Sequence, residues 1–315
     1  MRQSATGSSY IQSLQGKADR LMLIMIVVMG LLSLGLAAGT STWASFLLIS
    51  LPTVAVVAAQ VYLNPAHLLT RLTIAAAFMV LSAVTIHQAH GMIEMHFSIF
   101  VLLAVLLYYR DWRPLVFGAA VIAVHHLLFD FLQRNGWPVW VFDKDTGFII
   151  VVIHALFVVA ETAVLVVMAR QFAREVSILG ADPDQLIAVA NALAQGERVN
   201  QVNLNSLPAG SIGHAIHRTA TTMDATLGEV QAALIKLERG ELDGHVNEDG
   251  LQGRFAQMAR SVNHSLQQLD RVLSAAVHSA THLAKGQLGQ KVDVEASGLF
   301  AELRDSVNSM RQSVE

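Results

Sequence analysis

Long apolar stretches alternate with short polar ones through the first half of the chain, and polar helical periodicity then takes over. Six stretches have the length and hydropathy of membrane spans, the fourth being the shortest: Leu21–Ala38, Trp43–Leu63, Leu68–His90, Glu94–Tyr109, Pro114–Leu132 and Gly147–Ala169. After them, apolar residues recur every three or four positions among charged ones, as on amphipathic helices. The pattern predicts an all-α protein, a six-helix transmembrane bundle followed by a coiled-coil tail.

Composition agrees with a membrane protein that carries a polar appendage. Of 315 residues, 53% are hydrophobic and 14% are charged. The net charge of −3 and the dispersed basic residues argue against a nucleic-acid partner. Because cysteine is absent, disulfides, thiolate metal sites and Cys-ligated iron–sulfur clusters are excluded.

Basic residues predict the orientation of the spans. Successive loops between spans lie on alternate sides of the membrane. One side therefore has the basic residues Arg2, Lys17, Arg20, Arg71, Arg110, Arg113, Arg170 and Arg174, and the other has only Arg134 and Lys144. Positively charged loops stay in the cytoplasm, so both termini are expected there, in a bacterial inner membrane. No small-residue cleavage site follows the first apolar stretch, which is therefore interpreted as a retained span.

Histidines are the chief candidates for chemistry in the spans. Six lie inside or at the edge of apolar stretches: His87, His90, His96, His125, His126 and His154. An imidazole in hydrocarbon is costly unless it faces the bundle interior or binds something. In the predicted topology they form one layer in the outer half of the membrane, with His126 and His154 about 10 Å below its outer boundary.

Carboxylates accompany this layer. Asp130 follows His126 by four positions and Glu161 follows His154 by seven, so each pair projects from one side of its helix. Glu94 stands two residues before His96 and is expected to complete a buried polar set.

Such a layer is suited to haem b held by two neutral imidazoles. The best axial pair is His126 and His154, which share a depth on neighbouring spans, and His96 is an alternative ligand. Small residues leave room for the ring below them, namely Gly118, Ala119, Ala120 and Ala123. The predicted cofactor-binding residues are His87, Glu94, His96, His125, His126, Asp130, His154 and Glu161.

Other uses of the histidines stay open. The stretch HQAHGMIEMH combines imidazoles, thioethers and a carboxylate suited to copper or zinc, from His87, His90, Met92, Glu94, Met95 and His96. A single membrane histidine can also serve only in interhelical hydrogen bonds, and the adjacent His125 and His126, about 100° apart on a helix, cannot share a partner. A retinal protein is excluded because no lysine lies in a span, and a transporter is disfavoured because no repeat with broken helices is visible.

The tail contains three repeats, each with a helix, a glycine turn, an extended valine-bearing linker and a second helix. The turn glycines are Gly196, Gly240 and Gly286, spaced 44 and 46 residues apart. In the second unit a narrow apolar stripe is formed by Phe255, Met258, Val262, Leu266 and Leu269. A stripe of this width is best buried against partner helices. An unrelated dimeric stalk is the alternative interpretation.

The stretch RGELDGHV followed by GRFAQMARSVNHSL resembles the HAMP module, a parallel helix–connector–helix unit that dimerises into a four-helix coiled coil. The resemblance predicts a homodimeric relay in tandem copies, the first being the most divergent. The expected boundaries are a cytoplasmic segment at 1–20, a sensor domain at 21–170, a linker and first repeat at 171–228, a second repeat at 229–273 and a third at 274–315.

The membrane part, through HGMIEMHFSIF, VHHLLFDFLQ and HALFVVAET, resembles the six-span sensor domain found before HAMP arrays in bacterial methyl-accepting chemotaxis proteins. Some members of that group are thought to bind haem b, so the resemblance points to Glu94, His96, His125, His126, His154 and Glu161. It implies a non-enzymatic sensor of oxygen, redox state or a related cue, with a kinase and adaptor complex as partner. We expect an output domain beyond residue 315. The remaining alternatives are a copper or zinc sensor and a dimeric membrane b-type cytochrome.

Overall fold

All regular structure in the described part of the chain is helical, which confirms the all-α prediction. The computed structural model describes residues 7–143, 148–197, 207–287 and 291–313. The chain divides into two units, Met1–Leu186 with Asn203–His214, and Ile187–Val202 with Ala215–Glu315. We call them the membrane unit and the tail unit.

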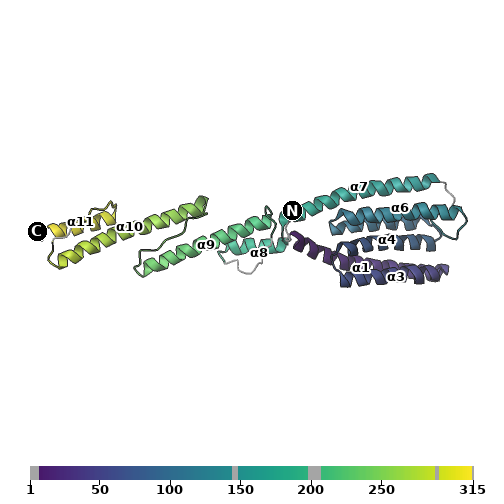
Figure 1. Ribbon diagram of the computed structural model, residues 1–315, viewed down its shortest axis with the longest axis horizontal. Helices are drawn as coiled ribbons and strands as arrows, with labels where there is room; N and C mark the ends of the chain where they lie inside the picture. Colours follow the sequence, from purple (N-terminus) through teal and green to yellow (C-terminus); the bar gives the residue numbers. More distant parts are fainter. Residues whose placement is uncertain (1–6, 144–147, 198–206, 288–290, 314–315) are drawn as a thin grey trace. The chain divides into compact units, whose positions relative to one another are not determined.

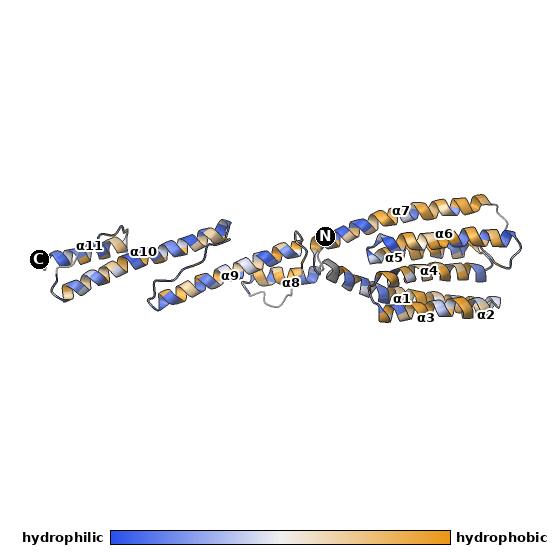
Figure 2. Cartoon of the chain, in the orientation of Figure 1, coloured by the Kyte–Doolittle hydropathy of each residue, from blue (hydrophilic) through white to orange (hydrophobic). Residues whose placement is uncertain are grey.

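The membrane unit contains helices long and apolar enough to cross a bilayer. Five such spans are found among the described residues, and a sixth apolar stretch, Ile93–Tyr109, is shorter. The helices are α1 (Gly7–Thr40), α2 (Trp43–Ser45), η1 (Phe46–Ser50), α3 (Leu51–Leu63), α4 (Leu68–Gln88), η2 (Ile93–His96), α5 (Phe97–Leu106), η3 (Leu107–Tyr109), α6 (Trp112–Arg134) and α7 (Phe148–Leu179). Figure 2 colours their hydrophobic residues orange.

The predicted spans agree with these helices, with differences at the ends. α1 begins at Gly7, so most of the segment expected at 1–20 continues the first span as helix. The fourth span is short because 3₁₀ turns, η2 and η3, close both ends of α5. α7 continues past Ala169 to Leu179. The predicted start of the sixth span, Gly147, lies outside the described residues.

Helix α4 forms the centre of the membrane unit, since it contacts α1, α3, α5 and α6 (Figure 1). Most of α4 is buried inside the protein, whereas most of the apolar residues of α7 lie on the surface of the bundle. Phe78 and Ile74 of α4 are fully buried in the main core cluster. Gly118 lets α6 approach closely, because a Cβ there would lie 3.3 Å from Leu103 and 3.7 Å from Ala75.

Buried polar side chains join three elements of this unit. Ser33 Oγ of α1 donates to Gln88 Oε1 of α4 at 2.9 Å and lies 2.7 Å from Ser50 Oγ, while Gln88 Nε2 donates to the Ser33 carbonyl at 3.1 Å. Ser50 ends η1, a π-helical turn within the second span. Because no water is available in hydrocarbon, these groups satisfy one another and fix α1, η1 and α4 together.

The helix that leaves the bundle, α7, ends at a glycine in the left-handed conformation. Gly180 has φ +75°, and a Cβ there would lie 2.5 Å from that of Ser211. A residue with a side chain is therefore disfavoured here by both backbone strain and contact. α8 (Pro183–Ala194) begins directly afterwards.

The second and third tail repeats follow the predicted order, whereas the linker predicted for the first repeat lies mostly outside the described residues. Gly196, Gly240 and Gly286 all have positive φ and follow α8, α9 (Ile212–Glu238) and α10 (Gly253–Ala284), and α11 (Leu299–Gln312) ends the series. Between α9 and α10, and between α10 and α11, the connector returns along the helices, so successive helices run in the same direction (Figure 1). The expected boundaries after residues 228 and 273 fall inside α9 and α10, which thus each serve two repeats.

An asparagine from the following helix holds each of the last two connectors. Asn263 Oδ1 accepts from Val246 N at 2.8 Å, and Asn263 Nδ2 donates to Val246 O at 2.9 Å. Asn308 makes the same pair of bonds to Val292, at 2.9 and 3.0 Å. The amide thereby satisfies both backbone polar groups of a buried valine, as a neighbouring β-strand would.

Replacing Asn263 with alanine should loosen the second connector. Two buried backbone groups of Val246 would lose their partners, at a cost of about 1–3 kcal/mol. Hydrogen exchange measured by mass spectrometry on the whole chain should become roughly 5- to 150-fold faster at the Val246 amide. His264→Ala, an exposed change on the same helix, is the control; equal protection in both variants would contradict the assigned role of the asparagine.

Candidate functional site

Three imidazoles from three helical segments meet in the membrane unit. His96 ends η2, His126 lies on α6 and His154 on α7. The ring centroid of His96 is 5.4 Å from that of His126 and 5.6 Å from that of His154. Phe142 stacks on His96 with an interplanar angle of 5° and a centroid distance of 5.6 Å. We call His96, His126 and His154 the histidine site.

Each ring of the histidine site is oriented by its own helix. Nδ1 lies close to the carbonyl oxygen four residues earlier, at 3.2 Å for His96, 3.0 Å for His126 and 2.9 Å for His154. A carbonyl can only accept, so each neutral ring carries its proton on Nδ1 and keeps the lone pair of Nε2. This is the arrangement that prepares a histidine for metal binding. His96 is 2% exposed, and its Nε2 has no partner among the described residues.

An apolar cavity of about 330 Å³ adjoins the histidine site. All three histidines line it, and one wall is formed by small side chains of α6, Ala119, Ala120 and Ala123. Thr162 of α7 also lines it, and its Oγ1 is buried without a partner among the described residues. The cavity, which we call the first cavity, therefore offers an apolar wall of small side chains beside nitrogen lone pairs.

The three predicted carboxylates have different surroundings. Glu94 is exposed, so the expectation that it completes a buried set is wrong; it lies in η2, where the chain enters the short span. Asp130 is buried near His126, but Arg134 binds its two oxygens at 2.9 and 3.0 Å. Glu161 is half-buried, with Oε2 unpartnered among the described residues.

The residues considered for copper or zinc are dispersed. His90 is exposed and packs edge-on against Trp140, with centroids 5.6 Å apart, and Met92 is 45% exposed. Met95 is partly buried against the main core. Within the described ranges no group of three or more His, Cys, Asp or Glu side chains is arranged to hold a metal ion.

His87 and His125 line a different cavity, of about 370 Å³, with residues of α4, α6 and the loop after α6. Trp140 N donates to His87 Nδ1 at 3.2 Å. His125 packs on Phe129, with centroids 4.3 Å apart. Because His125 and His126 are consecutive on α6, their rings face different cavities, as the helical angle between them requires. We call this the second cavity.

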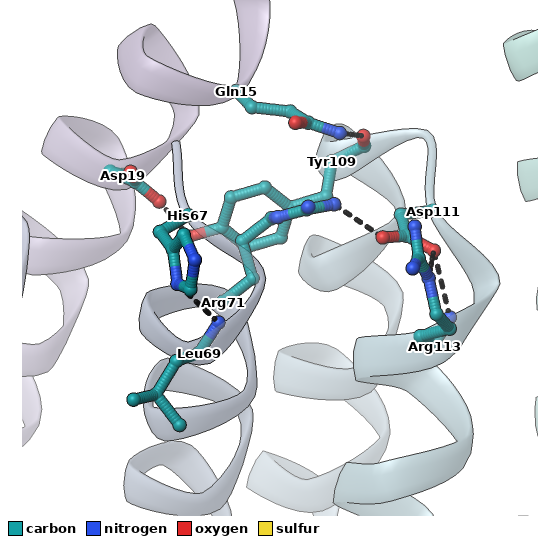
Figure 3. Close-up of polar contacts among 8 residues, drawn as sticks. All are labelled: Gln15, Asp19, His67, Leu69, Arg71, Tyr109, Asp111 and Arg113. Carbon is teal, nitrogen blue, oxygen red and sulfur yellow. Dashed lines mark hydrogen bonds and ion pairs between the residues drawn. The ribbon is translucent and has the colours of Figure 1, made fainter. Parts of the chain in front are cut away.

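Sequence reasoning missed a buried polar network at the other end of the bundle (Figure 3). Asp19 of α1 accepts from Ala66 N at 2.6 Å and from Tyr109 Oη at 2.8 Å. Arg71 of α4 donates to Asp111, which also accepts from Arg113 Nε at 3.0 Å and, as the N-cap of α6, from Arg113 N at 3.1 Å. Figure 3 shows Arg71 beside the Tyr109 ring, between the two carboxylates. The network ties α1, α4, η3 and α6 together.

One signal in the sequence pointed to this network. Asp19 and Arg71 are charged residues within or beside apolar stretches, and such residues pair when they are buried. From the sequence, Arg71 indicates only the orientation of the spans in the membrane. Its partners are distant in the sequence, so the pairing itself could not be predicted.

Comparison with known proteins gives a family for the end of the tail. Residues 250–315 match the HAMP domain family. The match begins just before α10 and includes the connector and α11, so the predicted HAMP resemblance is confirmed for this region. Asn308 and the Val292 backbone groups that it binds lie inside the residues that match the HAMP family, whereas Val246 lies before them.

A curated relative is similar over part of its length. The chain is 27% identical over 104 residues to "Methyl-accepting chemotaxis protein McpB" of Pseudomonas aeruginosa. The similar region is 33% of this chain and 15% of that protein. No solved structure matches the chain.

Removing Arg71 should destabilise the membrane unit much more than removing Arg113. Both bind Asp111, but the Arg71 side chain is 7% exposed and that of Arg113 is 50% exposed. Arg71→Ala leaves a buried carboxylate without its buried partner, a loss of about 3–5 kcal/mol. Arg113→Ala should cost about 0–1 kcal/mol. Thermal unfolding of the detergent-solubilised chain checks this, and similar midpoints for the two variants would contradict it.

Proposed function

We propose that this chain is the input part of a dimeric transmembrane chemoreceptor, which senses oxygen, redox state or a related cue through haem b at the histidine site. The apolar helices support a multi-pass inner-membrane protein, and the HAMP match and the chemotaxis relative support a signal transducer. Because basic residues concentrate in the loops on one side, we propose that both termini lie in the cytoplasm. The partners are a second copy, membrane lipid and a cytoplasmic output domain acting on a kinase and adaptor complex.

One observation carries the cofactor proposal. Three imidazoles have Nδ1 held by their own helices, and the Nε2 of His96 is buried beside an apolar cavity without a partner among the described residues. A buried polar nitrogen without a partner is costly, and ligation removes that cost. The alanine wall of α6 would accept a flat ring. The residues present therefore fit a haem.

The roles of the residues follow from their positions. His126 and His154 would hold the iron in this proposal, and His96, whose buried Nε2 has no partner among the described residues, is the alternative ligand. Haem b, when bound, would supply a reversible one-electron change or a site for a diatomic gas. Phe142 covers the three rings, with centroid distances of 5.6, 6.1 and 5.5 Å to His96, His126 and His154, and thereby limits the entry of water.

The path from the histidine site toward the tail is helical as far as Leu179. His154 and Thr162 of the first cavity lie on α7, which continues without a break to Leu179. A rotation or tilt that repacks α7 against α6 would therefore be carried to Gly180 and to the HAMP-like units, which relay signals by exchange between two packings. This relay favours a sensor over a membrane cytochrome, because an electron carrier does not need it.

Optical spectra test the cofactor. The purified chain, produced with haem available, should show b-type bands in reduced-minus-oxidised difference spectra. His126→Ala and His154→Ala should each abolish or shift the bands because an axial nitrogen is lost. Added imidazole should restore them if the fold is intact.

His90→Ala is the matched control, because His90 is exposed and does not line the first cavity. It should leave the bands unchanged. Unaltered bands in both the His126 and the His154 variants would reject this axial pair. Bound copper or zinc without b-type bands would reject the haem.

Filling the first cavity should lower haem binding without changing a residue proposed to bind the iron. Ala120→Phe places a large ring against the wall on which the haem would lie, so haem content per chain should fall at least about tenfold. Ala83→Phe, which fills the second cavity instead, should leave haem content unchanged. Pyridine haemochrome measurement checks both, and full loading of Ala120→Phe would contradict the placement.

A further inference from the structure

The second cavity lies on the other side of α6 from the histidine site and is a separate binding volume of about 370 Å³. Its walls are almost entirely apolar, including Met79, Ala83 and Val121. Ile49, which also lines it, is 43% exposed, so the cavity opens toward the apolar outer surface of the bundle. A molecule dissolved in the lipid could enter it directly.

The proton of His87 is fixed by its neighbour. Trp140 N donates to His87 Nδ1, so that nitrogen holds a lone pair and the neutral ring carries its proton on Nε2. This is the opposite tautomer from the rings of the histidine site. The Nε2–H of His87 has no acceptor among the described residues. His87 therefore presents a donor and not a metal-binding lone pair.

The same reasoning assigns the proton of His125. Its Nδ1 lies 3.5 Å from Nδ1 of His126, which already carries the proton that it donates to the Ile122 carbonyl. His125 Nδ1 can only accept at that contact, so the contact favours the tautomer with the proton on Nε2. Within the described part of the chain this donor has no acceptor.

We propose that the second cavity binds a lipid-soluble para-quinone, with the Nε2–H groups of His87 and His125 donating to its two carbonyl oxygens. The ligand must be apolar, to match the walls, and must bring acceptors, to satisfy two donors. It must also be neutral, because no charged side chain of the described residues lines the cavity. A planar ring with two opposed carbonyls meets all three conditions.

The fixed tautomers make the site selective for the oxidised form. A hydroquinone brings two hydroxyl protons, and among the described residues that line the cavity the only other side-chain polar group is the Ser45 hydroxyl. At least one of those protons would lack an acceptor, and leaving a donor unsatisfied weakens binding about tenfold. Occupancy of the second cavity would therefore follow the oxidation state of the membrane quinone pool. Binding here does not require a cofactor at the histidine site.

Equilibrium binding of decylubiquinone to the full chain in nanodiscs tests the proposal, with quenching of tryptophan fluorescence by the quinone as the readout. The reduced quinone and decylbenzene are measured by competition against it. The quinone should bind saturably, its reduced form about tenfold more weakly, and decylbenzene, which has the tail without oxygens, more weakly still. His87→Leu and His125→Leu keep apolar volume and should each lower the affinity about threefold to tenfold. Ala83→Phe should abolish saturable binding.

His90→Leu is exposed and Ala120→Phe fills the first cavity, so both should bind the quinone normally. Equal binding of quinone and decylbenzene, or an affinity unchanged by the His87, His125 and Ala83 variants, would overturn the proposal. Equal affinity for both oxidation states would overturn the selectivity. Normal quinone binding in a protein without b-type bands would reject only the haem at the histidine site.

Discussion

The lack of water inside a bilayer is the constraint on which this structure depends, because every polar group there must find its partner within the protein. Backbone groups meet it by forming helices. The side chains meet it in groups: the serines with Gln88 near one end, Asp19 with Tyr109 and Arg71 with Asp111 near the other. Groups that stay unpartnered in such a setting stand out, and in the described chain they include the Nε2 of His96 and the carboxylate of Glu161.

Hydropathy sufficed to place the helices because the bilayer fixes their length, and errors were confined to the ends. α1 and α7 extend beyond the apolar residues, since a helix does not need to stop where the hydrocarbon stops. Depth along a helix is also readable from residue number, which is why His126 and His154 were expected near each other and are both found beside His96.

The rotation of each helix about its own axis, and the pairing of side chains between helices, were much harder to predict from the sequence. His87 and His125 have the depth of the histidine site, yet α6 turns His125 to another cavity, where His87 also lies. Glu94 was expected inside and is outside because η2 turns the chain before α5 begins. The pairing of Arg71 with Asp111 depends on how α4 and α6 dock, which no local pattern encodes. In the tail, Asn263 and Asn308 occupy matching positions in the repeats, so a closer comparison of the copies could have found them.

The consecutive residues His125 and His126 have a consequence for how the two cavities communicate. A single rigid helix supplies a side chain to each, so turning α6 about its long axis moves both imidazoles through the same angle and improves one cavity's geometry only together with a change in the other. An occupant that requires a different angle of α6 would alter the affinity of the opposite cavity, and thermodynamic linkage makes this influence equal in both directions. A side chain that fills one cavity while α6 keeps its observed angle would not. Two neighbouring residues of α6 thus couple the two cavities through the angle of a single helix.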